Sequence, residues 1–128
     1  MFKSENRKSI LEWYSKRLGI SIVGKSVVFQ WKQKDYPNEF GHTVWAPFNR
    51  VTKYFHPSEK DFMINYRVDD LEALIKQLKN EGVEIVGEIE RYDYGKFDWI
   101  MDPEGNKIEL WEPNDEVFRR MNRIEGQS

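Results

Sequence analysis

Residues 102–113 read DPEGNKIELWEP, and this stretch decides the fold of the chain. Pro103 fixes φ at the first turn position, and Gly105 with Asn106 tolerates the positive φ that a hairpin turn needs. After the turn, apolar and polar residues alternate with the period of a half-buried strand. The pattern therefore predicts a hairpin whose second strand carries Glu109 on one chosen face.

Size and composition restrict the class of protein. The 128 residues suffice for one compact domain with a core and are too few for two ordinary independent ones. The 22 acidic and 20 basic residues nearly cancel, so we expect no nucleic-acid partner. There is no apolar run of transmembrane length and no signal-peptide pattern, so we expect no membrane partner. Cysteine is absent, which excludes disulfides and thiol nucleophiles and agrees with a cytoplasmic location.

Three short motifs recur in the same order along the chain. The pairs are GISIVG at 19–24 with GVEIVG at 82–87, FQW at 29–31 with FDW at 97–99, and VWAP at 44–47 with LWEP at 110–113. Their offsets are 63, 68 and 66 residues, each close to half the chain. Because such self-similarity indicates a repeated architecture, we infer two copies of one module.

The second module shows the full pattern of elements. Alternation predicts a strand at 61–68, and Asp69-Asp70 can cap a helix that Gly82 then ends. Apolar residues in that helix fall at i, i+3, i+4 and i+7. They are Leu71, Leu74, Ile75 and Leu78. Strands at 83–86, about 96–101 and 107–111 complete the order β-α-β-β-β.

The first module repeats this order from a shorter beginning. We predict a helix over about 5–18 and strands near 21–23, 27–32 and 43–46. The helix is expected to bury Ile10, Leu11, Tyr14 and Leu18. Only residues 1–4 precede it, so we expect a truncated first strand. A single domain 1–128 then contains module one (about 1–48), a connection (about 49–60), module two (about 61–113) and a tail (114–128).

The hairpin resembles the Asp-Pro-Xaa-Gly-Asn and Ile-Glu-Leu motif of the glyoxalase/bleomycin-resistance group, also called the vicinal oxygen chelate superfamily. The paired modules extend this resemblance over nearly the whole chain. It implies an α+β fold in which two β-α-β-β-β modules form curved mixed sheets around a cleft. It also implies a homodimer as the expected assembly.

The same resemblance bears on metal binding. In metal-dependent members, the first and last strands of each module each supply one ligand to a divalent ion. Glu109 occupies such a position and is a competent oxygen donor. The corresponding positions fall on Thr43, whose hydroxyl replaces a carboxylate poorly, and on Met63, whose thioether suits such ions badly. The fourth would precede Met1. We therefore expect no cofactor, with a divalent metal at Glu109 as the alternative.

Strand parity sorts the other candidate residues by face. Trp111 shares a face with Glu109, and Arg67 shares one with Asn65. The resemblance implies that this face lines the cleft, and apolar walls with few polar groups are typical of a small-molecule site. The expected ligand-binding residues are Thr43, Trp45, Tyr54, Asn65, Arg67, Trp99 and Trp111. An ion pair between Arg67 and Glu109 is an alternative to ligand contact.

The connection before module two has two interpretations. Residues 46–60 can simply bridge the modules, or they can form a lid whose Tyr54 and Phe55 close on a ligand.

These patterns favour a metal-independent protein that binds a small aromatic or amphiphilic molecule, as bleomycin-resistance relatives do. The alternative is a metal-dependent lyase, isomerase or dioxygenase of the same superfamily, with Glu109 as metal ligand or catalytic base. A protein-interaction module with a vestigial cleft is a third hypothesis. Whether the chain is an enzyme, and on what substrate, is left open by the sequence.

Overall fold

The computed structural model describes residues 1–22, 24–32, 40–114 and 116–117, with backbone alone for residues 30–32 and 40–42. It divides into two compact units, each described separately below. Unit 1 is described over Met1–Thr52, and unit 2 comprises Lys53–Val117. Most of the predicted tail, 118–128, lies outside the described residues.

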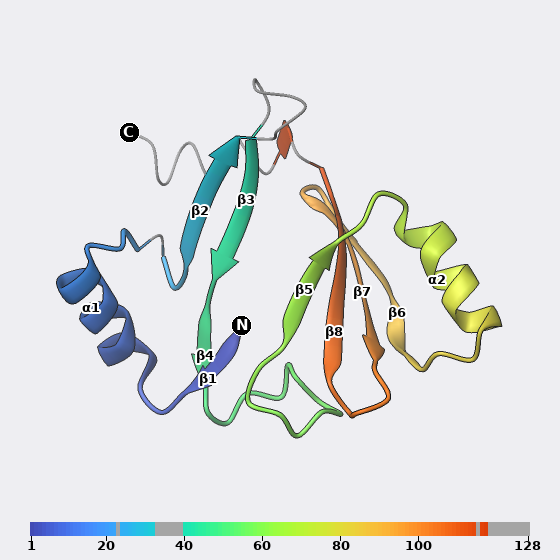
Figure 1. Cartoon of the computed structure of the whole chain (residues 1–128), viewed down its shortest axis with the longest axis horizontal. Helices are drawn as coiled ribbons and strands as arrows, with labels where there is room; N and C mark the ends of the chain where they lie inside the picture. The colour runs from blue at the N-terminus through green and yellow to red at the C-terminus, as the bar shows by residue number, and fades with distance from the viewer. Residues whose placement is uncertain (23, 33–39, 115, 118–128) are drawn as a thin grey trace. The chain divides into compact units, whose positions relative to one another are not determined.

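The described residues of unit 1, which leave out 23 and 33–39, form one helix and four strands (Figure 1). They are β1 (Phe2–Ser4), α1 (Arg7–Leu18), β2 (Val27–Lys32), β3 (Phe40–Trp45) and β4 (Pro47–Asn49). β1 runs parallel to β4, and β2 runs antiparallel to β3. The truncated first strand is thus a strand of three residues. The predicted strand at 21–23 is not found, since residues 21–22 lie outside any strand and Val23 lies outside the described residues.

Helix α1 begins where its cap dictates. The Asn6 side chain accepts a hydrogen bond from the Ser9 amide, so the helix starts at Arg7 and not at about residue 5. Leu11 is buried as predicted, but Leu18 is 60% exposed. The helix packs on β4 near its first turn, where the Arg7 Nε donates to the Pro47 carbonyl, 3.1 Å away. The predicted burial of Leu18 is wrong, because this residue lies at the end of the helix far from the turn that packs on β4.

In the part of unit 2 from Lys53 to Asn114, the structure describes one helix and a four-stranded mixed sheet. The elements are β5 (Ile64–Arg67), α2 (Leu71–Asn80), β6 (Ile85–Tyr92), β7 (Gly95–Met101) and β8 (Lys107–Pro113). The sheet order is β5-β8-β7-β6, with β5 parallel to β8 and the other pairs antiparallel. The β-α-β-β-β order predicted for this module and the α+β class are both confirmed.

The core of unit 2 lies between α2 and one face of the sheet (Figure 1). Leu71 and Ile75 of the helix are buried against Leu110 of β8. Partly buried aliphatic residues surround them, namely Val68, Leu74, Leu78, Ile85, Ile89, Ile100 and Ile108. Because side chains alternate along a strand, Lys107, Glu109 and Trp111 point to the opposite face.

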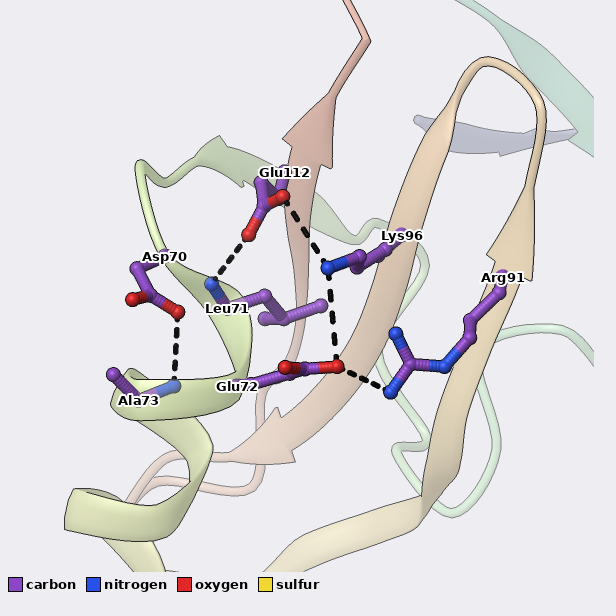
Figure 2. Close-up of polar contacts among 7 residues, drawn as sticks. All are labelled: Asp70, Leu71, Glu72, Ala73, Arg91, Lys96 and Glu112. Atoms are coloured by element: carbon purple, nitrogen blue, oxygen red, sulfur yellow. Dashed lines mark hydrogen bonds and ion pairs between the residues drawn. The ribbon is translucent and has the colours of Figure 1, made fainter.

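The start of α2 is held by two carboxylates, as Figure 2 shows. Asp70 accepts from the Ala73 amide at 3.1 Å, as expected for an N-cap. Glu112, at the end of β8, accepts from the Leu71 amide at 2.9 Å. The Lys96 Nζ lies 3.7 Å from Glu112 and 3.8 Å from Glu72, which also pairs with Arg91. The helix start therefore contacts the sheet through the hydrogen bond to Glu112 and through ion pairs at the surface.

The hairpin between β7 and β8 forms as the sequence predicts, with one difference. Gly105 has a φ of +82°, but no residue other than glycine has a positive φ among those described. Asn106 contributes differently: its side-chain amide donates to the Asp102 carboxylate at 2.7 Å. The backbone amides of Glu104 and Asn106 also donate to Asp102. These hydrogen bonds lower the pKa of Asp102.

Candidate functional site

The register of unit 2 brings three polar side chains into one row. Asn65 of β5 pairs with Glu109 of β8, and Glu109 pairs with Trp99 of β7. Paired residues in neighbouring strands point to the same face. Because Leu110 packs against α2, this row lies on the face turned away from the helix.

The Glu109 carboxylate is 5% exposed and accepts hydrogen bonds from three uncharged groups. Asn65 donates its amide Nδ2 to Oε1 at 2.7 Å. Trp99 donates its indole Nε1 to Oε2 at 2.9 Å. The hydroxyl of Tyr54 also donates to Oε2. Each carboxylate oxygen therefore faces hydrogen-bond donors of the protein itself.

Tyr54 reaches Glu109 from the connection that precedes β5, and Lys107 holds its backbone. The Lys107 Nζ donates to the Tyr54 carbonyl at 2.7 Å and lies 5.4 Å from the ring centroids of both Tyr54 and Trp99. Such positions over aromatic faces stabilise a cation. Burial lowers the pKa of Lys107, against the opposing charges of Glu109 and Glu90. Burial and the charge of Glu109 raise the pKa of Tyr54 above its ordinary value.

Aromatic rings continue along this face toward the β6–β7 turn. Phe97 stacks on Trp111, with centroids 5.9 Å apart and ring planes 10° apart. Tyr92 and Tyr94 stack on each other at 5.3 Å, and both meet Phe97 edge-on at 5.9 Å. Trp99 and Trp111 are buried, whereas Tyr92 is 48% exposed. We call Tyr92, Tyr94, Phe97, Trp99 and Trp111 the aromatic row.

The structure gathers most of the candidates of the second module. Tyr54, Asn65 and Trp99 all contact Glu109, and Trp111 lies on the same face. Arg67 is exposed and pairs with Trp111 across β5 and β8, so it lies on the same face as Glu109. Its role in ligand contact stays a prediction.

Two candidates belong to unit 1. Thr43 is exposed and pairs with Phe29 across β2 and β3. The Trp45 ring packs against Tyr14 of α1 at 4.7 Å and against Phe2 at 5.0 Å. Ligand contact by either residue stays a prediction.

The sequence interpretation missed some members of the site. Lys107 could have been found, because it precedes Glu109 by two residues and so shares its face. The stacking of Tyr92 on Tyr94 could not, since it depends on the conformation of the turn.

The residues around Glu109 do not fit a bound divalent ion. Its carboxylate oxygens accept hydrogen bonds from N–H and O–H groups, so hydrogen atoms surround them. A hard cation instead needs several oxygen or nitrogen atoms that offer lone pairs. Met63, at the position where the resemblance places a histidine, is 1% exposed and carries a thioether. Within the described ranges, no three His, Cys, Asp or Glu residues form a group that could hold a metal.

A family profile described as Glyoxalase/Bleomycin resistance protein/Dioxygenase superfamily matches residues 6–110. The chain belongs to this superfamily. The match covers both modules and ends at Leu110, one residue beyond Glu109. The resemblance drawn from the hairpin and the repeat is thus confirmed. No curated protein matches the chain.

Solved structures agree with the superfamily fold. Methylmalonyl-CoA epimerase from Mycobacterium tuberculosis is 20% identical, with a TM-score of 0.56 over 92% of this chain and 87% of that one. A superfamily member from Vibrio splendidus 12B01 is 12% identical, with a TM-score of 0.56 over 87% and 93%. A chain titled NAD-dependent benzaldehyde dehydrogenase from Legionella pneumophila, 12% identical, has the same TM-score over 88% and 96%. At these identities the likeness shows the fold alone. No helix in the described part of this superfamily member is both long and apolar enough to cross a membrane.

Proposed function

We propose that this superfamily member binds a small molecule without a metal ion. The observation that carries the proposal is the Glu109 carboxylate, whose oxygens accept hydrogen bonds from Tyr54, Asn65 and Trp99. A metal-dependent lyase, isomerase or dioxygenase would require these donors to leave the carboxylate. The one observation that favours this alternative is that Glu109 occupies a ligand position of the superfamily.

The aromatic row supports a flat aromatic or amphiphilic ligand. Its inner members are buried, but Tyr92 is half exposed and Phe97 is partly exposed. A ring stacked on these side chains removes apolar surface from water and gains favourable ring geometry. The superfamily also supports a homodimer, and the absence of cysteine supports the cytoplasm as the compartment.

Ligand binding is tested with two defined probes, bleomycin and 8-anilinonaphthalene-1-sulfonate, in buffer containing EDTA. We expect at least one of them to raise the Tm and to quench tryptophan fluorescence. Tyr92→Ala should weaken that binding by about tenfold, the usual loss for an aromatic contact of about 1.4 kcal/mol.

Tyr66→Ala is the matched control. Tyr66 is 54% exposed on β5 and, by strand parity with Asn65, lies on the opposite face of the sheet. Its loss should leave probe affinity unchanged. Binding that appears only after a divalent metal is added, or no binding of either probe, contradicts the proposal.

A further inference from the structure

Residues Lys53–Lys60, the part of the connection that belongs to unit 2, fold back on themselves before β5. The His56 amide donates to the Lys53 carbonyl at 3.1 Å, and the Ser58 amide donates to the Phe55 carbonyl at 2.9 Å. Phe55 is fully buried and Ser58 is 2% exposed. Two residues of this segment are therefore packed into unit 2, while its other residues are exposed.

Within unit 2, Tyr54 carries two hydrogen bonds between the connection and the sheet. Its hydroxyl donates to Glu109, and its carbonyl accepts from Lys107. Its ring also meets Trp99 edge-on, with centroids 6.1 Å apart. Glu109 and Lys107 are adjacent residues on one face of β8, so a single strand binds both ends of the Tyr54 residue.

We propose that Glu109 acts as the anchor of the connection, and that Tyr54 is the positioning residue through which the anchor works. The carboxylate at the ligand position of the superfamily thus holds the protein's own chain in place of a cation. The inference deepens the metal-independent function proposed above, yet it holds whether or not the aromatic row binds a ligand.

The physical reason is the cost of unpaired buried groups. Removing the carboxylate leaves the Tyr54 hydroxyl, the Asn65 amide and the Trp99 indole N–H without their acceptor, and each such loss destabilises a folded protein. A cation approaching Oε2 would first have to displace the hydrogens of Tyr54 and Trp99. By contrast, a carboxylate whose only role is to bind a ligand commonly leaves the stability of the free protein unchanged or lowers it.

The test is a double-mutant cycle of Tyr54→Phe and Glu109→Met, with stability measured by thermal unfolding in EDTA. We expect Glu109→Met to lower the Tm by about 5 °C or more, and Tyr54→Phe to lower it less. The double variant should lose less stability than the sum of the two single losses. In it the Tyr54 hydroxyl is absent, so Glu109→Met no longer leaves that hydroxyl without an acceptor. Tyr92→Phe is the control, since it removes a similar hydroxyl-to-carboxylate bond, to Glu90, at an exposed site.

Amide hydrogen exchange distinguishes local opening of the connection from a loss of stability of the whole unit. In Tyr54→Phe, which keeps the ring, the His56 and Ser58 amides should exchange roughly tenfold faster, while amides in the middle of α2 keep their rates. Two results overturn the proposal. One is a Glu109→Met protein as stable as the wild type, and the other is unchanged exchange in the connection. Neither result depends on whether the probes bind the aromatic row.

Discussion

The hydrogen bonds of Glu109 include features that the sequence predicts and features that it does not. The sequence predicts the strand and the face of Glu109, because both follow from alternation and the hairpin motif. Its place in a cleft beside tryptophans is implied by the family resemblance. The sequence does not predict the identity of its partners. Tyr54 lies 55 residues away, and its contact depends on the path of the connection. Tyr54, a lid residue in one of the two interpretations of the connection, therefore contacts the sheet itself.

A second buried carboxylate, Asp98, lies on the face that packs against α2, opposite Leu110. Burial raises its pKa, against a hydrogen bond from the Trp99 amide and the charge of Lys79. Because the folded state holds the proton more tightly, stability falls as the pH rises above the ordinary pKa of 3.8.

The substitution Asp98→Asn removes this charge and keeps the shape. We expect the free energy of unfolding in urea to increase at pH 7, and the gain to disappear at pH 3, where the aspartate is neutral in both states. An equal gain at both pH values would show that burial of the charge is not the cause.

Gly95 allows the inner part of the aromatic row to form. A Cβ there would lie 2.5 Å from the Trp111 Nε1 and 2.6 Å from the Glu112 carbonyl, and its φ is +145°. Gly95→Ala should cost about 2–4 kcal/mol of unfolding free energy, because it adds both a clash and an unfavourable φ.

Gly105→Ala separates these two effects. Its φ of +82° is also unfavourable, but a Cβ there meets nothing within 4 Å. We expect a cost of about 1 kcal/mol from the backbone alone. Equal costs for the two variants would contradict the close packing of Trp111.

At the scale of elements, the start of α2 combines predictable and unpredictable parts. The cap by Asp70 follows from the sequence, since aspartate before an apolar periodic run is a common N-terminal pattern. The contribution of Glu112 does not, because it comes from β8 and depends on the packing of helix on sheet (Figure 2).

Glu112→Gln should therefore lower stability by about 1 kcal/mol, since it weakens a charge-assisted hydrogen bond to the helix start. Glu72→Gln is the matched control: it removes an exposed carboxylate that pairs with Arg91 and Lys96, and we expect little change. Urea unfolding of both variants checks this. A larger loss for the Glu72 variant would show that the surface pairs, and not the cap, secure the helix.

The first module was predicted less well than the second. Its helix and the β2–β3 pair appear near the predicted positions, but β4 was assigned to no element. β4 has only three residues, too few for alternation to be recognised, and its pairing with β1 depends on residues 45 positions apart. Short strands of this kind are determined by tertiary contacts.

At the scale of the whole molecule, the internal repeat was the most reliable signal. The internal repeat predicts the two modules, and the resemblance of the hairpin implies the superfamily and its α+β class. The family match confirms the superfamily, and the order of elements in unit 2 confirms the β-α-β-β-β module. A repeat does not predict which side chains surround Glu109, because those contacts depend on strand register and on the path of the segment before β5.

Calorimetric titration of Ni²⁺ and Zn²⁺ into the EDTA-treated full chain, beside Glu109→Gln, tests most directly whether Glu109 is closed to metal. The account predicts that the wild type and the variant give the same titration, with no binding that depends on Glu109. Binding of one ion per wild-type chain, lost in Glu109→Gln, would contradict it.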